Sequence, residues 1–380
     1  LQNYALPFVS RYDDIASEEV NPVLVKASKK LDKYSISVYF DAEKKELQCE
    51  QYVDYTNRQK VSFEHLFFHL YPNSFKSEDK PAFPPDEMER AYPNGFSSGC
   101  IELESVYVDG NAVKFQAGGY SKDIMVIKLD KPLMPNDTAK IYMKYRIVLP
   151  NSVGRFGYGD HTFNISNWYP IACVYDSNGW NTDPYYPIGD PFYSGTANYE
   201  VRITAPKGYI IASTGDILSR KNDGDKTVWD IKALAVRDFA WVASNKLKMS
   251  SRIVDGIAIN SYYFTKNSGL KALDYAANAV GIYNKQFGKY PYRQLSIVEE
   301  DFFIGGMEYP NIILIDHSLY TSISKTWLEM VIVHETAHQW WYGIVGNNEI
   351  KEPWLDEGLA EYSTILYYGH RYGKEKQAQM

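Results

Sequence analysis

The first pattern along the chain is an alternation of apolar and polar residues. From Tyr34 to Phe40 every second residue is apolar, and the polar run 41–45 separates this segment from a similar one at 47–55. A period of two places alternate side chains on one face of a β-strand. The two segments therefore predict a pair of adjacent strands joined by a turn.

Short runs of the same kind continue to about residue 245. Turn-forming residues such as Asp109-Gly110 separate them, and many short strands with such turns are typical of an antiparallel sandwich or saddle-like sheet. The further predicted strands are 63–70, 101–108, 112–116, 124–129, 141–148, 199–204, 227–231 and 239–243.

Two other segments differ from this pattern, the first of which alternates only weakly. Residues 1–30 are expected to be an extended lead-in, and residues 163–194, rich in Gly, Pro and aromatic side chains, a long ordered excursion from the sheet.

The pattern changes near residue 254. Apolar residues recur at helical spacing from Leu270 to Phe287, where Gly288 and Pro291 end the predicted helix. Strands 295–298 and 311–315 and two further helices follow. The chain is thus expected to have an N-terminal all-β domain, residues 1–250, followed by an α+β domain, residues 251–380.

Candidate chemistry lies between residues 331 and 362. If residues 328–341 are helical, His334 and His338 lie one turn apart on one face, so both imidazoles can reach one metal ion. Glu335 follows the first histidine and can take a proton from a metal-bound water. Glu357, in a helix beginning near Pro353, would be the third ligand of one Zn²⁺ and leave the fourth position open.

Glu361 lies one turn beyond Glu357 and is placed to accept the second N–H of a ligand histidine. The alternative for Glu361 is a plain solvated or structural carboxylate. The HExxH pentapeptide also occurs by chance on amphipathic helices, but the apolar residues 331–333 before it and Glu357 after it favour the metal site.

HExxH, eighteen residues and then Glu357 within WLDEG resemble the M1 family of zinc aminopeptidases, gluzincins related to thermolysin. Upstream, Gly305-Gly306-Met307-Glu308-Tyr309 matches the family motif G-x-M-E-N except that Tyr309 replaces Asn. The resemblance implies that Glu308 binds the free α-amino group of the substrate, with Gly305, Gly306 and Met307 beside it in the substrate site. Glycines there let the backbone approach a ligand, although they could be only a turn before strand 311–315.

The resemblance implies a zinc-dependent aminopeptidase that hydrolyses the N-terminal peptide bond, with the β domain over a partial thermolysin-like domain. Strand 311–315 is expected to offer an edge to which a peptide adds. The family's oxyanion-stabilising tyrosine would lie beyond Met380, so we expect reduced or no peptidase activity from this chain alone. The alternatives are a non-catalytic zincin-fold scaffold, and a zinc endopeptidase or other hydrolase of the same fold.

Composition agrees with a globular protein. Of 380 residues, 45% are hydrophobic and 23% charged, and the net charge of −7 argues against nucleic acid as a partner. No apolar run approaches the length of a transmembrane helix. The expected partners are peptides with a free N-terminus.

Cys49, Cys100 and Cys173 are expected to be free thiols. The chain begins at Leu1 with no signal peptide in view, which suggests a trimmed chain. Compartment (cytoplasmic, cell-surface or secreted), oligomeric state and side-chain specificity are therefore left open.

Four other histidines were weighed as ligands. His65 and His69 are four residues apart but lie in a strand pattern, where that spacing spans roughly 13 Å, so we expect them to be structural. His161 and His317 are expected to be surface or loop residues without neighbouring ligands.

Overall fold

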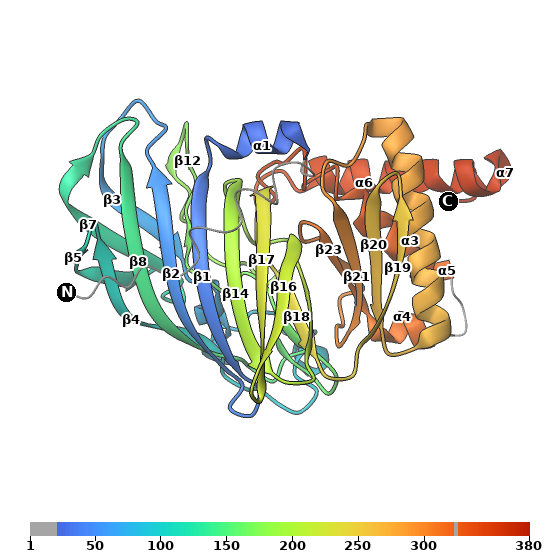
Figure 1. Ribbon diagram of the computed structural model, residues 1–380, viewed down its shortest axis with the longest axis horizontal. Helices are drawn as coiled ribbons and strands as arrows, with labels where there is room; N and C mark the ends of the chain where they lie inside the picture. Colours follow the sequence, from blue (N-terminus) through green and yellow to red (C-terminus); the bar gives the residue numbers. More distant parts are fainter. Residues whose placement is uncertain (1–20, 323–325) are drawn as a thin grey trace.

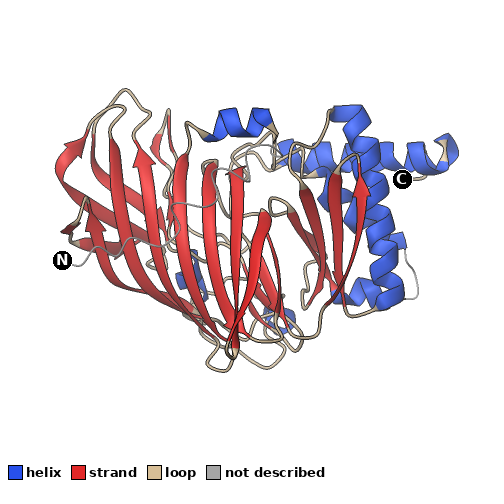
Figure 2. Ribbon diagram, viewed as in Figure 1, coloured by secondary structure: helices blue, strands red, loops and turns tan. Residues whose placement is uncertain are grey.

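The computed structural model describes residues 21–322 and 326–380. Figure 1 shows a large part built of strands beside a smaller part in which helices cover a second sheet. Figure 2 shows the same order along the chain, with strands dominating the first part and long helices confined to the end. The predicted fold class, an all-β part followed by an α+β part, is confirmed.

An eight-stranded sheet forms most of the first part. Strands β1 and β14 pair in parallel, and all its other neighbouring strands pair in antiparallel fashion. In spatial order the strands are β16 (Asp216–Asp223), β17 (Lys226–Val236), β14 (Ala197–Pro206), β1 (Asp32–Asp41), β2 (Glu46–Thr56), β8 (Thr138–Val148), β4 (Cys100–Val108) and β5 (Asn111–Ala112).

Strand β1 follows directly from its alternation. Tyr34, Ile36, Val38 and Phe40 are all buried, and the residues between them are more exposed. The Asp41 side chain then accepts hydrogen bonds from the backbone N–H groups of Glu43 and Lys44, at 3.1 and 3.0 Å. These bonds close the turn into β2.

Smaller sheets complete the first part. One contains β15 (Ile210–Ser213), β18 (Trp241–Ser244), β10 (Phe163–Ile165) and β9 (Phe156–Tyr158). Another contains β11 (Ile171–Ala172), β3 (Phe63–His69), β7 (Ile124–Leu133) and β6 (Phe115–Gly118). The last is the pair β12 (Tyr175–Asp176) and β13 (Gly179–Trp180), and the short helices here are α1 (Pro22–Ser28), η1 (Tyr71–Phe75) and α2 (Met88–Ala91).

Two sequence expectations in this part are wrong. The predicted single strand 112–116 is instead divided between β5 and β6, which belong to different sheets. The extended lead-in becomes helix α1 after residue 21, because Asn21 accepts the backbone N–H of Val23 and Pro22 occupies the first turn. Residues 1–20 of that prediction lie outside the described residues.

The second part has a five-stranded sheet with helices packed on it. Its strands, in spatial order, are β19 (Lys248–Val254), β20 (Ile257–Tyr263), β21 (Gln294–Glu300), β23 (Ile312–Asp316) and β22 (Gly306–Met307). Its helices are α3 (Lys266–Phe287), α4 (His317–Thr321), α5 (Thr326–Ala337), α6 (Trp354–Tyr372) and α7 (Lys374–Gln377). β23 lies between β21 and β22, so the expectation that strand 311–315 offers a free edge is wrong.

Alternate residues of this sheet belong to different cores. Ile297 and Ile313 pack with the helices, together with Val280 of α3 and Ile332 of α5. Val298 and its neighbours on the other face join the hydrophobic core of the first part. The two parts therefore share buried surface along a seam, and the boundary proposed near residue 250 stays a prediction.

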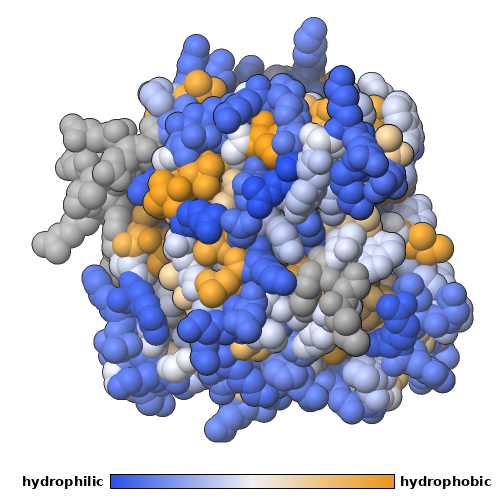
Figure 3. Space-filling view, turned by 90° about the vertical axis from the view of Figure 1, so that its right-hand side faces the viewer, coloured by the Kyte–Doolittle hydropathy of each residue, from blue (hydrophilic) through white to orange (hydrophobic). Residues whose placement is uncertain are grey.

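The surface of the helical end is mixed. Figure 3 shows it as mostly hydrophilic with separate hydrophobic patches. In the described part of the chain, no helix has both the length and the apolar character needed to cross a membrane. Cys49, Cys100 and Cys173 are buried free thiols, as predicted.

Glu300, at the end of β21, is a stability liability in this fold. Its side chain is fully buried, and neither carboxylate oxygen has a hydrogen-bond partner among the described residues. Burial, followed by the charges of Asp301 and Asp316, raises the pKa of Glu300 well above its usual range. The folded state therefore favours the protonated acid, and stability is lost as the pH rises from the unfolded pKa through the raised folded pKa.

Glu300→Met is expected to increase the free energy of unfolding at pH 8 by about 1–3 kcal/mol, since an unsatisfied buried polar group is removed. The gain should shrink towards pH 4.5, where Glu300 is protonated in the folded state and about half protonated in the unfolded state. Denaturant titrations at the two pH values measure the change in the free energy of unfolding. Glu104→Met, at an exposed glutamate, is the control. An equal gain at both pH values would contradict the assignment of the effect to a buried charge.

Candidate metal centre

Helix α5 delivers two histidines to one place. Its apolar residues Leu328, Ile332 and Val333 are buried in the core of the second part, which fixes the helix on the sheet. His334 lies in the last turn, and the backbone N–H of His338 bonds to the carbonyl of His334 at 3.3 Å. The two side chains thus keep the one-turn relation expected from their spacing.

The helix is shorter than predicted. It ends at Ala337 rather than continuing to residue 341, because the next backbone bonds tighten: Gln339 bonds to Thr336 and Trp340 to Ala337. His338 therefore sits just past the helix end, still over the last turn.

Helix α6 brings Glu357 to the histidine pair. The helix starts after Pro353, near the predicted position. Nε2 of His334 and Nε2 of His338 lie 3.2 Å apart, and Oε2 of Glu357 lies 3.1 Å from the first and 3.7 Å from the second. Two ligands of one tetrahedral zinc ion, with bonds of roughly 2.0–2.1 Å, are roughly 3.4 Å apart. These three donor atoms could therefore hold one such ion.

The Nδ1 contacts of the two rings bear on their tautomers. Nδ1 of His338 donates to the carbonyl of Trp341 at 3.0 Å, which leaves Nε2 as the lone-pair donor in the neutral ring. Nδ1 of His334 lies 3.5 Å from Oε2 of Glu361, the residue that the sequence suggested for this purpose. The Trp341 carbonyl was not foreseen, because a backbone group leaves no mark in the sequence.

The charges of the centre favour a bound cation. Hydrogen bonds from His334 and His338 lower the pKa of Glu357 below its usual range. Burial alone would lower the pKa of His338, but Glu308, Glu357 and Glu335 together raise it to about 10. The acids around these rings thus stabilise positive charge where the donor atoms meet.

Glu335, in the last turn of α5, lines the same cleft as His334 and Glu357. Its side chain is buried, and burial raises its pKa despite the two histidines. A Cβ atom on Gly306 would lie 2.2 Å from Oε1 of Glu335. Gly306 therefore lets the loop approach this carboxylate, which any side chain there would displace.

The loop before β23 supplies Glu308. This residue is 4% exposed, and one ligand atom each from Glu308, Glu335 and His338 lies within 4.8 Å of the others. Gly305 and Gly306 line the cleft. Met307, in contrast, is buried in the hydrophobic core and is contacted by Nε of Arg155 at 3.0 Å, so the structure places it behind the cleft wall.

Tyr309, the departure from the family motif, turns away from the centre. Its hydroxyl accepts a hydrogen bond from Ser166 at 2.7 Å and donates one to Asn167 at 2.8 Å, and its side chain is fully buried. Tyr309 therefore fastens the Glu308 loop to the first part of the chain.

Several buried charges near the centre were missed by sequence reasoning. Arg155 and Asp190 form an ion pair at 2.7 Å, and ligand atoms of Asp190, Glu308 and Glu357 lie within 4.8 Å of one another. Asp190 lies within residues 163–194, which were predicted to be an ordered excursion from the sheet, but the sequence did not indicate that this segment reaches the metal centre.

Two further acids lie behind Glu308. Ligand atoms of Glu349, Asp356 and Glu308 lie within 4.8 Å of one another, and all three residues are buried. Burial, followed by the neighbouring acids, raises the pKa of Glu349 well above its usual range. Asp356 precedes Glu357 in the WLDEG segment, the one signal that could have pointed to it.

These groups open onto a cleft of about 530 Å³. Both parts of the chain line it: Phe83, Ile188 and Asp190 come from the first, and His334 and Glu357 from the second. The arrangement provides a metal-binding donor set, a buried carboxylate beside it and a second carboxylate farther in.

Comparison with known proteins agrees with this geometry. Residues 271–380 match the family model described as the peptidase family M1 domain. Aminopeptidase 2 from Candida albicans is 22% identical over 333 residues, which are 81% of this chain and 34% of that protein. Endoplasmic reticulum aminopeptidase 2 from Homo sapiens is 30% identical over 115 residues, 28% of this chain and 11% of that protein. The chain therefore spans well under half of these relatives.

A solved structure shares the fold. A mutant M1 zinc metallopeptidase from Deinococcus radiodurans superposes with a TM-score of 0.62 at 15% identity, covering 92% of this chain and 72% of that one. The family match over residues 271–380, the aminopeptidase relatives and the common fold together show that this part of the chain is similar to the M1 peptidase domain.

Proposed function

We propose that this chain carries the metal centre and substrate-amine site of a zinc-dependent aminopeptidase, which hydrolyses the N-terminal peptide bond of peptides. The observation that carries the proposal is the position of Glu308, a buried carboxylate whose ligand atom lies within 4.8 Å of those of Glu335 and His338. The relatives' names support the same activity.

His334, His338 and Glu357 are the proposed zinc ligands. Their donor atoms, 3.1 to 3.7 Å apart, suit one tetrahedral ion. When bound, zinc lowers the pKa of a coordinated water and polarises the scissile carbonyl.

Glu335 is the proposed general base. Its buried carboxylate has a raised pKa, which suits a group that takes a proton from water and later returns it to the leaving amine. Gly306 supports this role by leaving room for the carboxylate.

Glu308 is the proposed anchor for the substrate's ammonium group. In a peptide, one carbon atom separates the terminal nitrogen from the first carbonyl carbon. A carboxylate close to the metal centre can therefore bind the ammonium only when the first peptide bond reaches that centre. An acetylated N-terminus has no positive charge to pair with the Glu308 carboxylate, and its acetyl group would occupy the position of that carboxylate. A chain that continues beyond this point, as in an endopeptidase substrate, meets the same obstacle, so Glu308 argues against the endopeptidase alternative.

The direct test compares an aminoacyl anilide with its N-acetylated twin. The zinc-loaded protein, in the longest native form that contains this chain, is expected to cleave only the free form. Equal cleavage of both would reject the amine site and favour the endopeptidase. Cleavage of neither would favour the non-catalytic scaffold.

Glu308→Gln is expected to lower kcat/KM for the free anilide by about 10- to 100-fold, because hydrogen bonds to charged groups contribute about 1.5–3 kcal/mol. Zinc content should stay at one ion per chain, measured by atomic emission. Glu87→Gln is the matched control, since Glu87 lines the same cleft. An equal loss in both variants would show that Glu308 has no specific part in binding the amine.

A further inference from the structure

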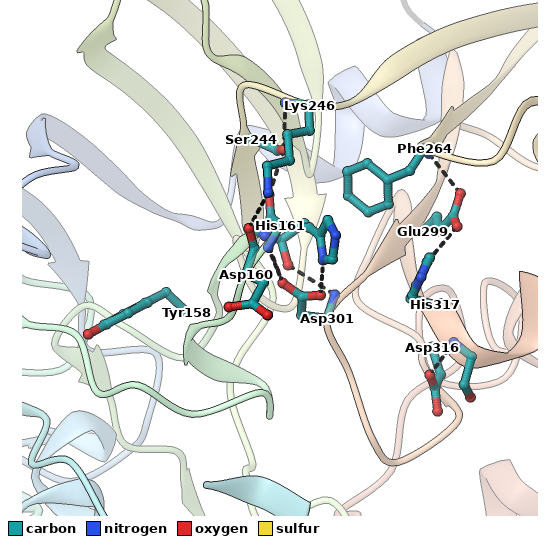
Figure 4. A network of polar contacts seen from close by, with 12 residues as sticks. Tyr158, Asp160, His161, Ser244, Lys246, Phe264, Glu299, Asp301, Asp316 and His317 are labelled. Carbon is teal, nitrogen blue, oxygen red and sulfur yellow. Dashed lines mark hydrogen bonds and ion pairs between the residues drawn. The ribbon is translucent and has the colours of Figure 1, made fainter. Parts of the chain in front are cut away.

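A second pair of histidines lies outside the cleft, and the expectation that they lack neighbouring ligand groups is wrong. Nδ1 of His161 lies 2.7 Å from Asp301, and Nδ1 of His317 lies 2.7 Å from Glu299. Figure 4 shows the two rings beside Phe264, each joined to its own carboxylate.

The two histidines come from opposite sides of the seam. His161 lies in the loop between β9 and β10 of the first part, whereas His317 is the first residue of α4 in the second. Asp301 crosses the seam, because its carboxylate accepts the backbone N–H groups of His161 and Thr162 as well as the ring of His161. The pair therefore exists only where the two parts meet.

The two carboxylates hold the rings in fixed positions. Glu299 is buried and also accepts the backbone N–H groups of Phe264 and Thr265, at 2.8 and 3.0 Å. A histidine whose Nδ1 donates to a fixed carboxylate presents the Nε2 lone pair outward, which is the usual arrangement behind metal-ligating histidines.

Both Nε2 atoms are available. Among the described residues, no hydrogen bond or ion pair involves Nε2 of His161 or His317. Their side chains are 34% and 33% exposed. An ion from solution can therefore reach the rings.

The spacing of the rings suits one shared ion. Their centroids are 5.4 Å apart, compared with 4.9 Å for His334 and His338. Two imidazoles bound to one ion through nitrogens at roughly 2.0–2.1 Å have centroids roughly 5 Å apart. The centroid separation of the second pair is therefore close to that of two imidazoles bound to one ion.

The surrounding charge also favours a cation. Glu299 and Asp301 lie at the carboxyl end of β21, and Asp316 ends the neighbouring strand β23. The hydrogen bond to Glu299, which outweighs burial, raises the pKa of His317. The nearby Lys246 in Figure 4 directs its ammonium group to the carbonyl of Asp160, at 2.6 Å.

We propose that His161 and His317 form a second metal site, for a divalent ion of the zinc, nickel or copper class, which imidazole ligands favour. Water completes the coordination. The ion cross-links the two parts of the chain at the seam, so its binding stabilises their docked arrangement. This site is separate from the cleft and does not depend on the proposed peptidase activity.

Calorimetric titration with Zn²⁺ tests the site. Protein already holding one zinc per chain is expected to bind one further ion, and the affinity for this ion should fall at least tenfold in both His161→Gln and His317→Gln. The control is His65→Gln, which alters a histidine of β3. It should leave the affinity for the second ion unchanged. Retention of the first zinc and an unaltered circular dichroism spectrum establish that each variant is folded.

Thermal denaturation supplies a second readout. Zinc beyond the first equivalent should raise the Tm of the wild-type protein, because a ligand of the folded state stabilises it, and this rise should vanish in His317→Gln. Absence of a second equivalent, or its persistence in both seam variants, would overturn the proposal.

Discussion

Replacing Glu335 with glutamine is expected to lower kcat/KM by about 10²- to 10⁴-fold, the usual contribution of a general acid–base group. The amide keeps the size of the side chain, so the approach of Gly306 and the path of α5 are preserved. It cannot accept a proton from water at neutral pH, and it also lacks the negative charge of Glu335 beside His338, so zinc content is measured in parallel.

The measurement is steady-state hydrolysis of an aminoacyl anilide by wild-type and variant proteins at equal zinc content. Glu329→Gln is the matched control, since Glu329 lies on the same helix but bonds to Tyr367 and Tyr372 instead of facing the cleft. Activity within tenfold of the wild type would remove Glu335 from the proposed mechanism, and loss of zinc from the variant would assign it to metal binding.

His338→Ala is expected to weaken zinc binding by at least about 100-fold. A structural zinc site with four ligands contributes about 10–16 kcal/mol in total, so one ligand accounts for several kcal/mol. The buried acids Glu308, Glu335 and Glu349 would also lose the cation beside them. The variant should therefore both release zinc and unfold at a lower temperature.

Competition with a chromophoric chelator measures the affinity, and differential scanning calorimetry measures the Tm. His69→Gln is the control, because His69 is equally buried but lies in β3 and stacks on Tyr71, with ring centroids 4.6 Å apart. Zinc affinity within a few-fold of the wild type in His338→Ala would contradict the proposed ligand set.

Local geometry explains which features the sequence revealed. His334 and His338 are neighbours because a helical turn makes them so, and Glu357 follows at a spacing that one loop and one helix start can bridge. Strand β1 was likewise evident, since the alternation over residues 34–40 indicates one buried face. In each case the feature is determined by residues that are close together in the sequence.

Long-range contacts were hidden for the opposite reason. Asp190 and Arg155 reach the cleft from the first part, and Tyr309 finds Ser166 across more than a hundred residues; no local pattern records such pairings. Strands of two residues, such as β11 and β22, are too short to show a period. The predicted free edge at β23 was wrong because the two-residue strand β22 already pairs with it.

The Tyr309 hydroxyl links the loop that carries Glu308 to the β-rich part of the chain. Its hydrogen bonds to Ser166 and Asn167 fasten the residue next to Glu308 to the β-rich part, while the histidines belong to the helical part. Glu308 itself lies between β22 and β23 of the helical part, so its position depends on contacts with both parts. If Glu308 binds the substrate amine as proposed, a substitution of Ser166 or Asn167, outside the cleft, is expected to alter that binding through Tyr309.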